Sequence, residues 1–201
     1  MEVSAGGESL IFAAAWTRPP PCAIDSPARP PYPPRAMSAL PALAAPLFEI
    51  RPERPADAAA VERVIARAFG PGRFAKTAER LREGARFRPD LSFVAWSDGE
   101  LVGAVRLWTI HVGGEPTAFL GPIAVDADQR GAGLGAALVE AATAAAEAAG
   151  ERAVLLVGDP PFFGPLGFVR AQGVDLPGPV DRARVLVRPF GPEAPRGRAT
   201  P

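Results

Sequence analysis

The chain has very few of the residues from which metal sites, disulfides and catalytic triads are built. It contains one cysteine, Cys22, and one histidine, His111, among 201 residues. A single cysteine excludes an internal disulfide framework and a thiolate metal site. A single histidine excludes a histidine-rich metal centre and argues against a Ser-His-Asp triad. We therefore expect no metal.

An excess of charge of one sign is also missing. The 22 basic and 22 acidic residues cancel, so no global field attracts nucleic acid or an anionic membrane. No apolar run approaches the ~20 residues of a membrane-spanning helix. Residues 10–16 are apolar and short enough for a signal-peptide core, but Glu2 and Glu8 precede them where basic residues belong. We expect a cytoplasmic protein that binds neither nucleic acid nor membrane.

Proline is concentrated near the N-terminus, in Pro19-Pro20-Pro21, Pro30-Pro31 and Pro33-Pro34. These prolines oppose both helix and sheet. We predict that residues 1–46 form a disordered tail, and that residues 191–201 form a second one. Two alternatives remain for the first segment. In the first, translation begins at Met37 and the preceding residues are an artefact of the gene start. In the second, the prolines form a polyproline ligand for a partner.

Residues 47–190 between these tails are predicted to form one α+β domain. The predicted strands are 47–51, 91–96, 101–108, 118–125 and 153–157. One predicted helix ends at Gly70, and two others span residues 75–85 and 133–149. Asp98-Gly99 and Gly113-Gly114 are two-residue hairpin signals. An antiparallel meander followed by a strand–helix–strand crossover implies a mixed, mostly antiparallel sheet flanked by helices.

The segment with the clearest chemistry joins the strand at 118–125 to the following helix. It reads Arg130-Gly131-Ala132-Gly133-Leu134-Gly135-Ala136. Such a turn directs several backbone N–H groups to one spot, glycines keep side chains away, and the helix N-terminus adds positive partial charge. The sequence therefore predicts a phosphate or pyrophosphate site with Arg130 as a charge partner.

Three other kinds of glycine loop compete with this interpretation. A Walker loop would end in Gly-Lys-Ser/Thr, which is missing here. The glycines satisfy the dinucleotide fingerprint G-x-G-x-x-G/A, but residues 126–130 separate them from the strand and an antiparallel meander precedes them. Glu151, at the distance of a ribose-binding acid, comes before the next strand instead of ending it. The loop could also be a purely structural glycine turn.

The loop and a later segment together resemble a known family. Arg130-Gly131-Ala132-Gly133-Leu134-Gly135 matches the motif R/Q-x-x-G-x-G/A of the GNAT (GCN5-related N-acetyltransferase) family. Gly158-Asp159-Pro160 followed by Phe162-Phe163-Gly164-Pro165-Leu166-Gly167-Phe168 resembles the short closing helix of that family with its L-G-F ending. The resemblance covers nearly all of residues 47–190 and is closest to a bacterial subgroup of predicted N-acetyltransferases.

The resemblance implies a GNAT-like sheet with a β-α-β unit that binds acetyl-CoA as co-substrate. The fourth and fifth strands of the family splay apart, so Ile123, Ala124 and Val125 would hold the pantetheine arm. The pyrophosphate would be held by Arg130, Gly131, Ala132, Gly133, Leu134, Gly135 and Ala136. An amine of a small molecule or protein would attack the thioester directly, with the backbone N–H of Val125 as oxyanion donor. The family relation leaves open a monomer or a homodimer.

One departure from the family concerns the general acid. Many members have a tyrosine in the closing helix that protonates the leaving thiolate, and Phe163 occupies that position here. Tyr32, the only tyrosine, lies in the proline-rich segment. An alternative to catalysis is therefore a catalytically weak module that binds or senses acyl-CoA.

Four residues are candidates for a general base, and each has a plainer interpretation. His111 has the most suitable unperturbed pKa but lies near a predicted hairpin tip. Asp126 and Asp128 follow the fourth strand as loop caps or solvated charges, and Asp159 lies in a turn. Trp96 and Trp108 are expected to pack on the sheet, although Trp108 could line an acceptor pocket.

Overall fold

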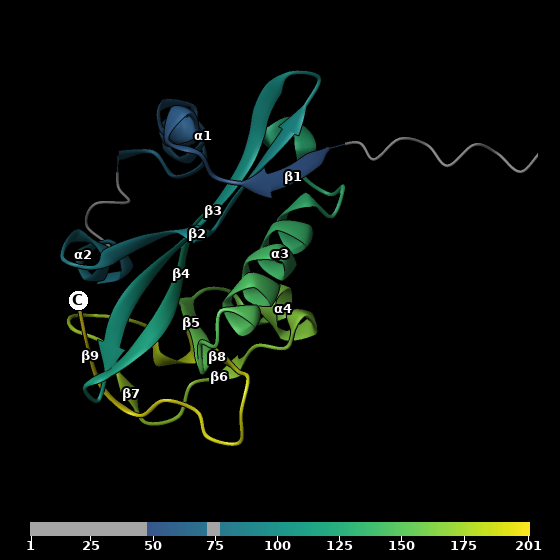
Figure 1. Ribbon diagram of the computed structural model, residues 1–201. Coiled ribbons are helices and arrows are strands. Elements are labelled where there is room, and N and C mark those ends of the chain that lie inside the picture. The colour runs from purple at the N-terminus through teal and green to yellow at the C-terminus, as the bar shows by residue number, and fades with distance from the viewer. Residues whose placement is uncertain (1–47, 72–76) are drawn as a thin grey trace, which may run out of the picture. The chain divides into compact units, whose positions relative to one another are not determined.

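The computed structural model describes residues 48–71 and 77–201, so the predicted tail at 1–46 lies outside the described residues. The described part contains a mixed sheet with helices on both faces (Figure 1). Its strands are β1 (Glu49–Pro52), β2 (Arg86–Ser97), β3 (Glu100–Val112), β4 (Glu115–Val125), β5 (Ala153–Val157), β6 (Val169–Arg170), β7 (Val174–Asp175), β8 (Val185–Pro189) and β9 (Gly197–Thr200). Its helices are α1 (Ala58–Phe69), α2 (Thr77–Glu83), α3 (Leu134–Ala148) and α4 (Pro160–Phe163). The predicted α+β class is confirmed.

The strand order is β1-β2-β3-β4-β5-β8-β6, and β9 pairs with both β3 and β7. All neighbours along the main path are antiparallel except β4 and β5, which are parallel. The parallel pair is joined through α3, which is the crossover that the strand–helix–strand pattern predicted. The sheet is therefore mixed and mostly antiparallel, as expected.

The two predicted hairpin turns are confirmed. Ser97 lies opposite Glu100 around Asp98-Gly99, where φ is 50° and 80°. β3 and β4 are joined by Gly113-Gly114, with φ of 62° and 89°. Positive φ at both central residues gives a turn whose twist matches that of the flanking strands.

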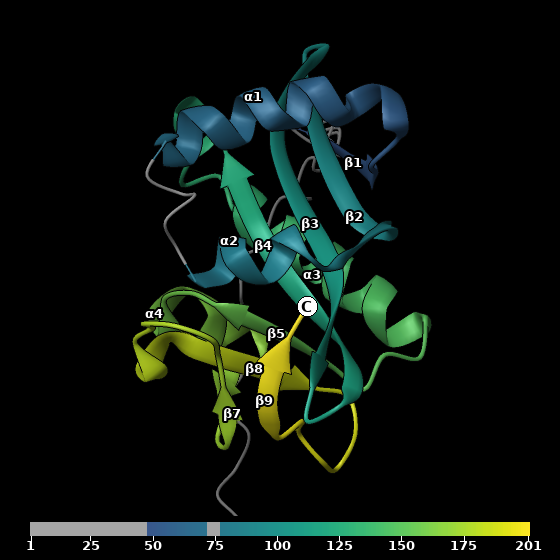
Figure 2. The ribbon, with the colours of Figure 1, turned by 90° about the vertical axis from the view of Figure 1, so that its left-hand side faces the viewer.

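Helices cover the sheet on two faces. Figure 2 shows α1 and α2 in front of the strands and α3 behind them. Side chains alternate along β3 accordingly: Val105 and Leu107 pack in the cluster that contains the apolar side of α3, and Ala104 packs in the cluster of α1. Full burial of a large apolar side chain contributes roughly 1.5–3 kcal/mol to the free energy of folding. The helices on the two faces are therefore bound to the sheet mainly by apolar side chains that alternate along the strands.

The expectation of a disordered C-terminal segment at 191–201 is wrong for residues 197–200, which form β9. β2 pairs with β3 only as far as Thr109, and β9 takes up the β3 edge beyond it, with Thr200 opposite His111. The sequence of β9 contains no run of apolar residues. Its extended conformation depends on the strand edge that it completes, which a local pattern cannot reveal.

The contact between the β3–β4 turn and the segment before β9 provides a test of this placement. A Cβ added to Gly113 would lie 2.3 Å from the carbonyl oxygen of Arg196, whereas one added to Gly114 would meet no atom within 4 Å. Both glycines have positive φ. We expect Gly114→Ala to lower the free energy of unfolding by about 1 kcal/mol for the backbone conformation alone. Gly113→Ala should lower it by about 3 kcal/mol, because the β9 segment must move.

Urea unfolding of the two variants, followed by circular dichroism, measures this difference. Equal losses for the two variants would contradict the close approach of residues 196–197 to the turn.

Candidate functional site

β4 loses its parallel neighbour half-way along its length. It pairs with β5 only at Ala118, Phe119 and Leu120, yet it stays paired with β3 as far as Val125. β5 is bonded along its other edge to β8. The stretch of β4 after Leu120 therefore presents an open edge on the side from which β5 has diverged.

Two residues direct their backbone groups to this open edge. The N–H of Asp126 donates to the carbonyl oxygen of Val102 on β3 at 2.8 Å. Alternate residues of an antiparallel ladder point their backbone groups to the same neighbour, so those of Ala124 also face β3. The N–H and C=O groups of Ile123 and Val125 consequently point away from β3. This geometry is compatible with their predicted role in holding an extended ligand.

An irregularity in β4 marks the point of divergence. Gly121 and Pro122 together lie opposite a single residue of β3, Arg106. The indole N–H of Trp108 donates to the carbonyl oxygen of Gly121 at 2.8 Å. A Cβ on Gly121 would lie 2.9 Å from a guanidinium nitrogen of Arg82 on α2. The bulge is therefore contacted by Trp108 and Arg82.

The loop after β4 begins with an anchored aspartate. The Asp126 carboxylate accepts a hydrogen bond from the N–H of Ala127 at 2.9 Å and forms an ion pair with Arg67 of α1 at 2.7 Å. It starts the short 3-10 helix η3 (Ala127–Gln129), on which Asp128 is exposed. Asp126 is thus a loop cap, in agreement with the plainer of its two interpretations.

The glycine loop itself is exposed and opens α3. Gly131 and Gly133 have φ of 85° and 78°, and a Cβ on either would meet no atom within 4 Å, so backbone conformation and not crowding requires glycine there. The N–H of Ala137 donates to the carbonyl of Gly133 at 3.0 Å. The N–H groups of residues 134–136 lie in the first turn, before this bond, and so have no acceptor within the helix. Arg130 is exposed beside them. These properties suit an anion.

The aromatic pair of α4 reaches the same region. Phe162 is 43% exposed, and a Cβ on Gly135 would lie 3.3 Å from its ring. Phe163 is buried edge-to-face against Phe162 and Phe168, with ring centroids 4.8 and 5.6 Å apart, and it covers Gly158 at the end of β5. The position expected for a general acid is therefore part of an apolar aromatic cluster that has no proton to donate.

The remaining candidate bases lie elsewhere or are engaged. His111 is on β3, eight residues from Gly103, which lies opposite Val125, and this separation is about 26 Å at ~3.3 Å per residue. Its Nδ1 lies 3.2 Å from the carbonyl oxygen of Pro201. Asp159 forms an ion pair with Arg184 at 3.0 Å. The structure does not bring His111 to the open edge of β4.

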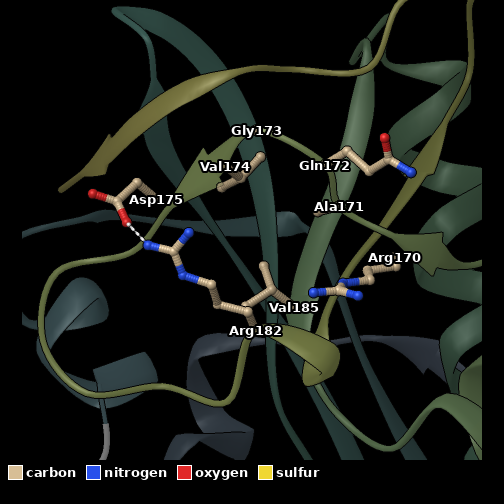
Figure 3. Close-up of a pocket in the computed structure, with 8 residues that line it drawn as sticks. All are labelled: Arg170, Ala171, Gln172, Gly173, Val174, Asp175, Arg182 and Val185. Atoms are coloured by element: carbon tan, nitrogen blue, oxygen red, sulfur yellow. Dashed lines mark hydrogen bonds and ion pairs between the residues drawn. The ribbon is translucent and has the colours of Figure 1, made fainter.

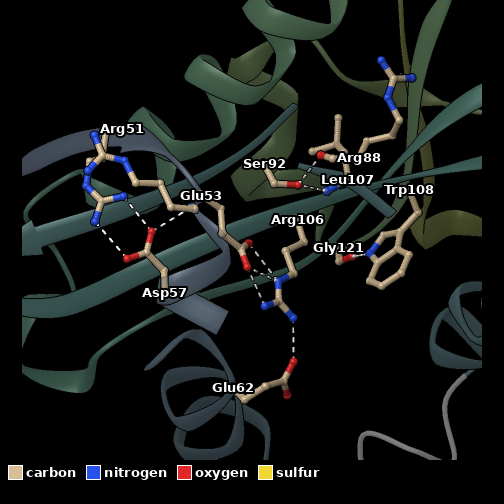
Figure 4. A network of polar contacts seen from close by, with 11 residues as sticks. Arg51, Glu53, Asp57, Glu62, Arg88, Ser92, Arg106, Leu107, Trp108 and Gly121 are labelled. Atoms are coloured by element: carbon tan, nitrogen blue, oxygen red, sulfur yellow. Dashed lines mark hydrogen bonds and ion pairs between the residues drawn. The ribbon is translucent and has the colours of Figure 1, made fainter. Parts of the chain in front are cut away.

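A buried ion-pair network behind the bulge was not anticipated from the sequence (Figure 4). Arg106 is 8% exposed; its Nε and Nη2 donate to the Glu53 carboxylate at 2.9 and 2.7 Å, and its Nη1 donates to Glu62 of α1 at 2.6 Å. Burial lowers the pKa of Arg106, but the hydrogen bonds and charges of Glu53 and Glu62 more than offset this, so its pKa is raised. The available signal was an arginine between Val105 and Leu107 in an apolar strand.

Two concavities in the described part lie apart from the glycine loop. One, of about 510 Å³, is lined by residues 170–175 with Arg182 and Val185 (Figure 3). The other, of about 390 Å³, is lined by residues that include Trp96, over whose ring Arg51 lies at 5.2 Å. Residues 48–71 and 77–201 contain no cluster of three or more His, Cys, Asp or Glu residues arranged to hold a metal ion. No helix described here is long and apolar enough to cross a membrane.

Comparison with known proteins agrees with this geometry. Residues 58–168 match the model of the "Acetyltransferase (GNAT) family". The chain is 35% identical over 130 residues to the "Uncharacterized N-acetyltransferase YhbS" of Escherichia coli (strain K12), which covers 63% of this chain and 77% of that protein. Escherichia coli YhbS solved in complex with CoA has a TM-score of 0.67 at 28% identity, covering 78% of this chain and 91% of that one. A GNAT family acetyltransferase from Brucella melitensis in complex with acetyl-CoA has a TM-score of 0.59 at 29% identity, covering 77% and 95%.

The chain belongs to the GNAT acetyltransferase family, as its glycine loop and closing segment predicted. Its mixed sheet and flanking helices are those of GNAT structures. The class of chemistry that follows from this membership is acyl transfer.

The ion-pair network yields a prediction about stability. Glu53→Gln should lower the free energy of unfolding by about 3 kcal/mol, because the buried Arg106 then keeps only Glu62 as a charged partner. The side chain of Glu62 is 50% exposed, so water screens that pair. Asp90→Asn is the matched control, since the Asp90 side chain is 56% exposed in its pair with Arg88. This substitution should lower the free energy of unfolding by less than about 1 kcal/mol.

Urea denaturation of both variants at neutral pH measures the two losses. A change for Glu53→Gln no larger than that of the control would show that the network adds nothing to stability.

Proposed function

We propose that the protein transfers the acetyl group of acetyl-CoA to an amine of a small molecule or a protein. The observation that carries the proposal is that the open edge of β4 leads within a few residues into the exposed glycine loop and the N-terminus of α3. An extended amide-containing arm and a pyrophosphate are the two chemical parts that such an arrangement accommodates. Two solved relatives are complexes with CoA and acetyl-CoA, which supports the same cofactor for this chain.

Binding divides between the strand and the loop. The pantetheine amides bond to the backbone groups of Ile123 and to the carbonyl of Val125 in the manner of an added strand, whereas the backbone groups of Ala124, between them, face β3. The pyrophosphate lies on the N–H groups of residues 130–136, that is Arg130, Gly131, Ala132, Gly133, Leu134, Gly135 and Ala136, with the Arg130 guanidinium as counter-charge.

The reaction proceeds without a covalent enzyme intermediate. The amine nitrogen bonds to the thioester carbon, the C–S bond breaks, and CoA leaves as thiolate while the amine releases a proton to solvent. The backbone N–H of Val125 stabilises the developing oxyanion, and catalysis rests mainly on positioning. Because thiols have a pKa near ~8.5, the thiolate can leave without a general acid at the position of Phe163, although more slowly than with one if its protonation limits turnover.

A second function is an acyl-CoA-binding module with weak catalysis. The specific observation that favours it is the burial of Phe163 in an apolar aromatic cluster. Both functions share the same cofactor site, so they differ only in turnover.

Calorimetric titration of the full chain with acetyl-CoA, CoA and NAD tests the cofactor site. We expect binding of the two CoA species only. Ala132→Asp should weaken CoA binding at least about tenfold, because it places a carboxylate in the loop that receives the pyrophosphate. Ala144→Asp is the control, since Ala144 is likewise exposed but lies later in α3, and it should leave CoA affinity unchanged. Binding of NAD, or equal effects of the two substitutions, would contradict the assignment of the glycine loop as the site of the CoA pyrophosphate.

Tyrosine at position 163 separates slow catalysis from binding alone. If thiolate protonation limits turnover, Phe163→Tyr should raise kcat by about 10²-fold, the lower end of general acid–base contributions. Phe162→Tyr adds the same hydroxyl to the neighbouring, exposed ring and should change kcat less than about twofold. Release of CoA thiol with a panel of amines measures both. An unchanged kcat in Phe163→Tyr with unchanged CoA affinity would rule out protonation of the thiolate as the limiting step.

A further inference from the structure

The larger concavity lies outside the proposed cofactor site. It has a volume of about 510 Å³ and is formed by the connection from β6 to β7 together with the short 3-10 helix η5 (Arg182–Arg184) (Figure 3). Its lining residues are Arg170, Ala171, Gln172, Gly173, Val174, Asp175, Arg182 and Val185. Figure 3 shows Arg170 and Arg182 on either side of Val185. None of these residues has a part in the proposed acetyl-CoA site.

Positive charge exceeds negative charge in this pocket. Arg182 pairs with Asp175 at 3.0 Å, but the two side chains are 74% and 63% exposed, so water screens the pair and a ligand can compete for it. Arg170 forms no ion pair with any residue of 48–71 or 77–201. The side chain of Arg196 packs over Gly173, where an added Cβ would lie 3.6 Å from its Cγ. Guanidinium groups in such an arrangement bind carboxylate or phosphate.

The pocket lies close to the open edge of β4. Val185 is the partner of Val157, the last residue of β5, and β5 is the strand that diverges from β4 just beyond Leu120. Neighbouring strands are about 4.8 Å apart, so Val185 is roughly two strand spacings, about 10 Å, from Leu120, the residue of β4 at which the open edge begins. Val185 also belongs to the core cluster that contains Leu81 of α2. The pocket and the Trp108 side of the bulge therefore share one face of the sheet.

We propose that this pocket binds an anionic group, a carboxylate or a phosphate, of the amine acceptor. The inference rests on the proposed acetyl transfer and narrows it to one substrate class: amines whose negative charge lies roughly 10 Å or more from the reacting nitrogen. Gln172 also lines the pocket, and Val174 and Val185 supply apolar surface for a hydrocarbon spacer.

Anion binding can be measured without catalysis. Titration of the full chain with acetate, and separately with inorganic phosphate, should shift the Nε–Hε resonances of Arg170 and Arg182 in a saturable manner. Arg152 is the internal control, because its side chain is 64% exposed and its contact with Glu193 is 3.9 Å long. The two titrations also distinguish the carboxylate from the phosphate. Shifts at Arg170 and Arg182 that stay linear and equal to those at Arg152 would overturn the anion site.

Matched acceptors then test the substrate class. Acetylation of 8-aminooctanoate should show a KM at least about tenfold below that of octylamine, and 8-aminooctyl phosphate should show a lower KM than 8-aminooctanoate if phosphate is the better ligand. Arg170→Gln combined with Arg182→Gln should abolish the preference while CoA affinity, measured by calorimetry, stays unchanged. Arg152→Gln should keep it.

Each alternative result is decisive. Equal use of charged and uncharged amines, a preference that survives the double substitution, or no turnover of any charged amine would overturn this inference. A failure of CoA to bind would instead overturn the proposed function, and the resonance titration would then decide the anion site by itself.

Discussion

The separation of β4 from β5 is the constraint on which the site depends. Both strands can part without leaving backbone groups unpaired on their outer edges, because β3 stays with β4 and β8 stays with β5. The extra residue at Gly121-Pro122 makes β4 irregular at that point, and the hydrogen bond from Trp108 holds the irregularity in place. Continued pairing with β5 would occupy the backbone groups of Ile123 and Val125, and no ligand could be added there.

The elements around the open edge are held by two different kinds of contact. On one face α3 comes close to β3, because Gly103 has no side chain: a Cβ there would lie 2.9 Å from Leu138. On the other face the Arg106 guanidinium links β3 to α1 and to Glu53. Buried ion pairs contribute little net stability relative to apolar packing, yet they are costly to break. We interpret this network as a device that fixes α1 relative to the bulge.

The sequence predicted those parts of the fold that leave a local signal. Asp98-Gly99 and Gly113-Gly114 defined the meander, and the glycine loop with the alanine-rich helix defined the crossover. β8 was missed although it reads Val185-Leu186-Val187, because the prolines and glycines before it gave no periodicity. β9 was missed because long-range pairing alone makes it a strand. The divergence of β4 and the Arg106 network both depend on tertiary partners. The family resemblance predicted the divergence, whereas the network left only one sequence signal, an arginine between Val105 and Leu107, which did not identify its partners.

The strand β9 also has a consequence for how the chain folds. Its partner on β3 lies roughly 90 residues earlier, a long-range contact of the kind that forms late and slowly. During synthesis, the end of β3 beyond Thr109 is therefore a bare edge until the segment around residue 200 is available. Unpaired edges are templates for association with other chains. The C-terminal segment thus covers an edge of the sheet that could otherwise pair with another chain, and we expect shortening of this segment to favour aggregation during expression.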